Sequence, residues 1–141
     1  MGASPFDPER VARALYARDP SVTTFGIELV AASLDRSEVR MAVRPEFCNG
    51  FGILHGGVTF LLADSAMAFA SNAENVVSLA SSAAIDWLAP VASGADLTAV
   101  AERRWTNGRT TIWDITVTSS GETVALMRGT TRTTGTAVIE A

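Results

Sequence analysis

The chain has 141 residues, a formal net charge of −4 and one cysteine, Cys48. A chain of this length can bury a hydrophobic core, and we expect a single domain over residues 1–141. The acidic balance argues against a general nucleic-acid-binding protein, and one cysteine allows neither an intrachain disulfide nor a cysteine-based zinc site. The first residues lack the basic start and apolar stretch of a signal peptide, so we expect a cytoplasmic protein.

The first predicted element is a short amphipathic helix over residues 7–19. Pro8 suits its first turn, where a missing N–H does no harm, and Pro20 is expected to end it. We treat residues 1–20 as an N-terminal helical extension of the domain.

The next part of the sequence predicts two strands and then a buried helix. Apolar and polar residues alternate between Gly26 and Pro45, with a polar turn at Asp35–Arg36. Residues 45–54 are expected to be irregular. The segment from about Gly57 to Asn72 is apolar on every side, which predicts a helix buried within the fold.

After this helix the hydrophobic pattern changes to a period of two. Asn107-Gly108 is a strong hairpin signal, and Ser120-Gly121 predicts a second tight turn. The expected strands are Val76–Leu88, Leu97–Thr106, Arg109–Ser119 and Thr123–Thr134. The order of elements favours an α+β fold in which a curved antiparallel sheet wraps around one long central helix.

Asp64 is the principal catalytic candidate because it lies inside the apolar run Val58–Ala70. An ionised carboxylate in such a helix is costly unless it is paired, hydrogen-bonded or used in chemistry. No basic residue stands three or four positions to either side, so no local helical ion pair explains it. Perturbed acids cluster at active sites, where a carboxylate serves as a nucleophile or as a general base toward water.

Gly56 and Gly57 stand where the central helix is expected to begin. The first N–H groups of a helix have no partner inside it and favour an oxyanion, and glycines let a carbonyl approach the backbone closely. The pair is a candidate oxyanion hole for acyl transfer or a simple tight turn. His55, just before it, is a candidate general base or fixes the loop by hydrogen bonding.

The spacing of these candidates predicts an oligomer. Gly56 and Asp64 are eight residues apart on one helix, a rise of about 12 Å, so one acyl carbon cannot touch both. If both act on one carbonyl, Asp64 must meet the glycine of another subunit across a two-fold axis, giving two equivalent sites per dimer. The hydrophobic content of 48% is consistent with apolar surface buried between subunits.

Further candidates lie outside the helix. Asn49 either forms a turn or positions water or a departing sulfur. Arginines in the late strands either form a solvated face or bind phosphate groups of a substrate; they include Arg109 and Arg128. Large side chains that could line a substrate pocket, or simply pack in the core, are Phe60, Met67, Phe69 and Trp87. No metal and no separate cofactor are expected.

Four motifs together resemble the PaaI-type acyl-CoA thioesterases of the hotdog fold, a family associated with phenylacetate degradation. The resemblance extends from about Gly26 to the C-terminus. The motifs are Asn49-Gly50-x-Gly52-x-x-His55-Gly56-Gly57, Leu62-Ala63-Asp64-Ser65-Ala66, Ile85-Asp86-Trp87-Leu88-x-Pro90 and Val124-Ala125-Leu126-Met127-Arg128-Gly129.

The resemblance implies a role for each site residue and an assembly. Asp64 would be the catalytic carboxylate, the Gly56 amide of another subunit would polarise the thioester carbonyl, and His55 would shape that loop. Asn49 would assist at the water or the thiolate. Some relatives place a water-orienting serine on the long strand, which Ser81 or Ser82 could supply. The family forms tetramers from two hotdog dimers.

We therefore expect hydrolysis of an acyl-CoA, with an aromatic acyl group such as phenylacetyl or a hydroxylated form. Two alternatives stay open. A medium-chain fatty acyl-CoA thioesterase would use the same machinery with a different acyl pocket. A non-catalytic acyl-CoA binding module would keep the pocket and the arginines without turnover.

Overall fold

The computed structural model describes residues 6–140, so the first five residues of the predicted extension and Ala141 lie outside the described residues. The elements in chain order are α1 (Pro8–Ala17), α2 (Pro20–Phe25), β1 (Glu28–Ala32), β2 (Arg36–Ala42), the 3₁₀ turn η1 (Pro45–Phe47), α3 (Gly56–Ser71), β3 (Ser78–Trp87), β4 (Asp96–Asn107), β5 (Thr110–Ser119) and β6 (Glu122–Thr133).

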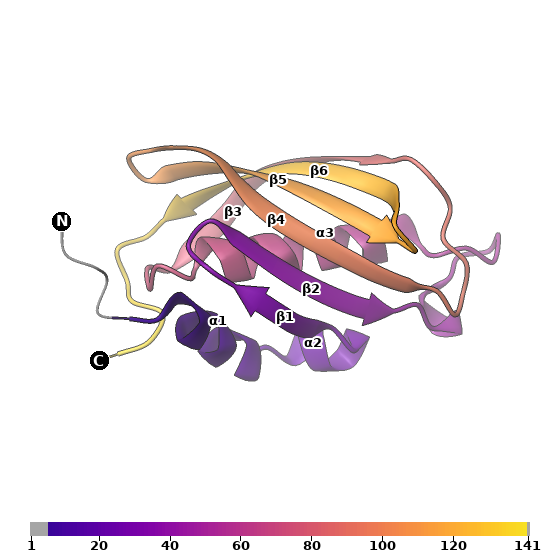
Figure 1. Cartoon of the computed structure of the whole chain (residues 1–141), viewed down its shortest axis with the longest axis horizontal. Helices are drawn as coiled ribbons and strands as arrows, with labels where there is room; N and C mark the ends of the chain where they lie inside the picture. The colour runs from indigo at the N-terminus through magenta and orange to yellow at the C-terminus, as the bar shows by residue number, and fades with distance from the viewer. Residues whose placement is uncertain (1–5, 141) are drawn as a thin grey trace.

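The strands form one antiparallel sheet in the order β1-β2-β4-β5-β6-β3. The sheet curves over α3 (Figure 1), which packs against β2, β3, β4, β5 and β6. The predicted α+β arrangement, a curved antiparallel sheet around one central helix, is confirmed. The hairpin predicted from Asn107-Gly108 also forms, but its turn lies one residue later, at Gly108 and Arg109, because Asn107 is the last residue of β4 and pairs with Thr110 of β5. Gly108 adopts the left-handed region at φ 60°.

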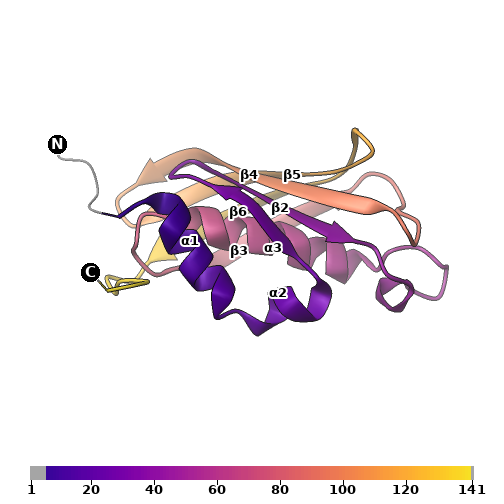
Figure 2. The same ribbon diagram turned by 60° about the horizontal axis from the view of Figure 1, so that its bottom comes forward.

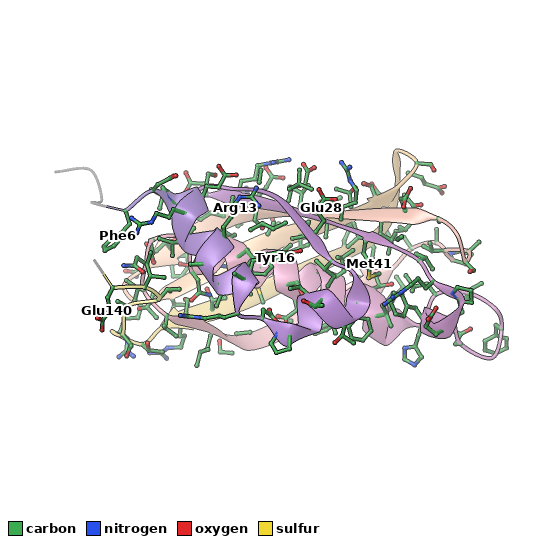
Figure 3. All side chains as sticks on the ribbon, turned by 90° about the horizontal axis from the view of Figure 1, so that it is seen from below. Phe6, Arg13, Tyr16, Glu28, Met41 and Glu140 are labelled. Atoms are coloured by element: carbon green, nitrogen blue, oxygen red, sulfur yellow. The ribbon has the colours of Figure 1, made fainter. Side chains whose placement is uncertain are left out.

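The two short N-terminal helices lie on the side of α3 that the sheet leaves open, next to the edge strand β1 (Figure 2). The Tyr16 hydroxyl donates to the carbonyl of Ile27 at 2.6 Å, and the Arg13 guanidinium donates to the carbonyl of Leu29 at 3.2 Å. Figure 3 shows both side chains on α1, seen from this side. These bonds fix the helical extension to the first strand.

One local prediction in this region is incomplete and another is wrong. Pro20 does not only end α1 but begins α2, because the Asp19 side chain caps the new helix by accepting the Ser21 N–H at 2.9 Å. Proline is well tolerated at a first helical position. Arg36 is not a turn residue either: it is the first residue of β2 and pairs with Glu102 of β4.

The core lies between α3 and the concave face of the sheet. Every second residue of β5 points inward, and Trp113 is 1% exposed, with its indole Nε1–H donating to the Thr131 hydroxyl at 3.0 Å. Gly129 of β6 faces Met67 of α3 so closely that a Cβ there would overlap the methionine sulfur. The helix and the sheet are therefore in direct contact at this point.

β3 differs from the other strands because it lies at an edge of the sheet and almost all of it is exposed. Leu79 is 61% exposed and Trp87 is 55% exposed. An exposed edge strand carries unpaired backbone groups and is a ready template for pairing with another strand.

Candidate functional site

The start of α3 is held by the histidine that precedes it. His55 is the N-cap, and its Nδ1 accepts the Gly57 N–H at 2.8 Å, while its carbonyl accepts the Val58 N–H at 2.9 Å. The imidazole thus fixes the loop by hydrogen bonding, one of the two roles considered for it. Because the imidazole accepts the Gly57 N–H, that N–H is not available to donate to a ligand.

The Gly56 N–H has no hydrogen-bond partner among residues 6–140. Gly56 lines a hollow of about 330 Å³ between the helix start, the preceding loop and the end of β3. The lining includes Asn49, Thr59, Trp87, Pro90 and Val124. A free amide at a helix N-terminus beside such a hollow can stabilise an oxyanion.

Asn49 lies at the same hollow with its amide oriented by the loop. Its Oδ1 accepts the N–H of Phe51 at 3.0 Å, an Asx turn of the kind that Asn-Gly sequences favour. With the oxygen engaged, the Nδ2H₂ group is the part of the side chain left to interact with a ligand. Asn49 is thus both a turn residue and a potential donor.

Asp64 lies two turns further along α3 and is half-buried. Its carboxylate makes no hydrogen bond or ion pair with any residue in the described range 6–140. Burial raises the pKa of Asp64 above the ordinary aspartate value. Asp64 lines a second hollow of about 190 Å³, together with residues of α3, β3 and β6 that include Met67, Ser71 and Thr131.

Gly56 and Asp64 therefore open onto different hollows of the same chain. The helical rise between them is about 12 Å, as the sequence spacing predicts. A single reacting carbonyl cannot contact both groups of one chain.

The raised pKa gives a testable effect on stability. A carboxyl whose pKa is higher in the folded state destabilises the fold in full above that pKa, and the effect declines as pH falls and vanishes below the ordinary value of 3.8. We expect Asp64→Asn to unfold at a higher temperature than the wild type at pH 7, with a difference that shrinks on acidification. Thermal unfolding followed by circular dichroism at pH 7, 5 and 4 measures this.

The exposed Asp96 on β4 is the matched control, because Asp96→Asn removes a carboxylate that is not buried. We expect its unfolding temperature to stay close to that of the wild type across the series. Equal stability of the Asp64→Asn protein and the wild type at pH 7 would contradict a costly burial of Asp64.

The remaining predicted binding residues lie away from Gly56. Arg128 and Asp114 form a bidentate pair on the outer face of the sheet, at 2.8 and 3.1 Å, and this hydrogen-bonded pair lowers the pKa of Asp114. Arg109 donates twice to the carbonyl of Thr133. Ser81 donates to the carbonyl of Thr130 at 3.3 Å, and Ser82 is exposed on β3. The structure does not bring these residues together with Gly56.

One contact at the site was not predicted. The sequence predicts Trp87 as a side chain that lines a pocket or packs in the core, but its indole Nε1–H donates to the carbonyl of Gly56 at 3.1 Å. No signal in the sequence indicates this bond, because 31 residues separate its partners. Of the other large candidates, Met67 lines the hollow at Asp64, whereas Phe69 is fully buried.

Among residues 6–140, no group of three or more His, Cys, Asp and Glu side chains is arranged to hold a metal ion. Within the same range, none of the helices has the length and apolarity needed to cross a membrane.

Comparison with known proteins identifies the family. Residues 51–126 match the model of the thioesterase superfamily. The chain is 36% identical over 119 residues to the acyl-coenzyme A thioesterase PaaI of Escherichia coli, covering 84% of this chain and 85% of that protein.

Solved structures show the same relationship. The E. coli PaaI protein from the phenylacetic acid degradation operon has a TM-score of 0.91 and 32% identity, over 96% of this chain and 99% of that one. A mutant of the phenylacetic acid degradation protein PaaI from Thermus thermophilus has a TM-score of 0.78 and 32% identity, over 81% and 98%. The predicted hotdog fold is confirmed, and the chain belongs to the thioesterase superfamily of thioester hydrolases.

Proposed function

We propose that the protein hydrolyses acyl-CoA thioesters, with Asp64 of one subunit and the Gly56 N–H of another acting on the same carbonyl. The proposal rests on two polar groups of α3 that have no partner among the described residues. One is a half-buried carboxylate with a raised pKa and no ionic partner among the described residues, and the other is a free amide at the helix start. The acyl-CoA thioesterase to which the chain is 36% identical supports the substrate class.

The exposed edge of the sheet supports the dimer that this chemistry requires. Antiparallel pairing of β3 with β3 of a second copy would remove the exposed edge and cover Leu79, which is 61% exposed. A two-fold axis through this strand would also run the two α3 helices antiparallel beneath the joined sheet, which sets the N-terminus of one toward the middle of the other. Two such dimers would form the expected homotetramer.

The roles of the residues follow from their chemistry. The Gly56 N–H would donate to the carbonyl oxygen as negative charge develops on it. Asp64 would either take a proton from water as the water attacks the carbonyl carbon, or attack the carbon itself to form an anhydride that water then hydrolyses. In both routes the C–S bond breaks, coenzyme A leaves as the thiolate and the acid is released. The Nδ2H₂ of Asn49 would donate to the water or the departing sulfur.

We further propose substrate-binding roles for two serines and two arginines that lie away from Gly56. Ser81 and Ser82 lie on β3, the strand proposed to pair between subunits, where a hydroxyl of either could orient water. Arg109 and Arg128 are proposed to contact the coenzyme A phosphates; both are exposed, although each already has a partner within the chain. An aromatic acyl group of the phenylacetyl type is proposed on the strength of the relatives associated with phenylacetate degradation.

A panel of acyl-CoAs, assayed for release of free thiol, tests the proposal. We expect phenylacetyl-CoA and its hydroxylated forms to be hydrolysed faster than medium-chain fatty acyl-CoAs. The reverse order would support the fatty acyl-CoA alternative. If titration calorimetry showed tight binding of these thioesters without any release of thiol, the protein would be a non-catalytic acyl-CoA binding module and not an enzyme.

A further inference from the structure

The peptide unit between Gly56 and Gly57 is held by a ring at each end. Its N–H, which belongs to Gly57, donates to His55 Nδ1 at 2.8 Å, and its C=O, which belongs to Gly56, accepts the indole N–H of Trp87 at 3.1 Å. The two rings come from different parts of the fold, one from the loop before α3 and the other from the end of β3.

The same two rings lie close to the place where a side chain would begin on either glycine. A Cβ on Gly56 would lie 3.0 Å from Nε1 and Cε2 of Trp87, and a Cβ on Gly57 would lie 3.0 Å from Nδ1 of His55. Each glycine thus makes room for one ring. The arrangement also offsets the main disadvantage of a Gly-Gly sequence, its conformational freedom, at the place where a fixed amide is needed.

We propose that Trp87 is a positioning residue for the reaction, acting with His55 to clamp the Gly56–Gly57 peptide so that the preceding N–H, that of Gly56, keeps a fixed direction. This inference rests on the proposed function, since it assigns Gly56 the oxyanion-stabilising donor. Such a donor is effective when it is oriented before the reaction begins, because it then needs no reorganisation as charge develops. Trp87 would therefore act on turnover rather than on substrate affinity.

The discriminating variant is Trp87→Phe, which keeps an aromatic ring beside the hollow and removes the N–H. We expect kcat to fall about 5- to 10-fold, the size expected for loss of one hydrogen bond, with KM within about twofold of the wild type. Trp105→Phe is the matched control, because Trp105 is 49% exposed on β4 and does not line either hollow. We expect it to leave both constants unchanged.

A double-mutant cycle with His55 tests whether the two rings act on one peptide. Once one end of the peptide is loose, releasing the other end should matter less, so the losses in kcat of His55→Ala and Trp87→Phe should not multiply in the double variant. Losses that multiply, or a Trp87→Phe variant that changes only KM, would show that Trp87 is a pocket wall and overturn the proposal.

Hydrogen exchange separates this inference from the proposed function. We expect amides at residues 55–58 to exchange faster in Trp87→Phe than in Trp105→Phe, whatever the substrate. If the wild type hydrolysed no acyl-CoA, the proposed function would fall, while exchange would still decide whether Trp87 holds the peptide. Equal exchange in the two variants would reject the clamp even in an active thioesterase.

Discussion

Asp64→Asn is expected to lower kcat for thioester hydrolysis by about 10²–10⁴-fold, the range typical of a lost general acid–base group. The asparagine has nearly the same shape but can neither accept a proton from water nor attack a carbonyl carbon. Because Asp64 has no ionic partner among residues 6–140, the substitution leaves no basic side chain without its ion-pair partner. Thiol release measured at saturating substrate, alongside the unfolding temperature, separates lost chemistry from lost folding.

The same variant tests whether the site is shared between subunits. Gly56→Pro removes the proposed donor at a first helical position, where proline is tolerated, although the half-exposed Trp87 has to move aside. In a dimer of one Asp64→Asn and one Gly56→Pro chain, one site carries both changes and the other carries neither. Refolding equal amounts together should restore about a quarter of the wild-type activity, since half of the dimers are mixed and each has one intact site. A mixture no more active than either variant alone would contradict a site formed in trans.

The fold could be predicted from the sequence wherever one strong local pattern decides the structure. The apolar run around Asp64 predicted α3, which spans Gly56–Ser71, and Asn107-Gly108 predicted the β4–β5 turn. The helix α2 was missed because proline both ends and begins helices. Only the side chain of Asp19, placed to accept the Ser21 N–H, distinguishes the two outcomes here.

The candidate site was predicted only in part, for a similar physical reason. Gly56, Asp64 and His55 are close along the chain, so helix geometry alone relates them. The bond from Trp87 to the Gly56 carbonyl depends on how β3 crosses the start of α3, which no local pattern encodes. The partners of Arg128 and Arg109 likewise lie across strands, so a count of arginines could not show that these two are already engaged.

The largest expected loss of stability follows from truncating Trp113, the largest fully buried side chain of the core. Trp113→Ala should lower the free energy of unfolding by about 3–5 kcal/mol, because it removes a fully buried ring and leaves a cavity beneath β5. It also deprives the Thr131 hydroxyl of its indole partner and exposes the Arg103 guanidinium, which stacks 4.9 Å from the ring centre. Thermal unfolding at fixed protein concentration should show a decrease of roughly 10–20 °C in Tm.

The chain supplies its own control for this experiment. Trp105→Ala removes the same side chain from a position on β4 that is 49% exposed. The substitution therefore loses little of the free energy of burying the ring and leaves no cavity. We expect a change in the free energy of unfolding of about 1 kcal/mol or less. Similar losses for the two variants would mean that Trp113 is not enclosed between α3 and the sheet. Because α3 carries both Gly56 and Asp64, that result would also remove the structural basis for the arrangement of the site.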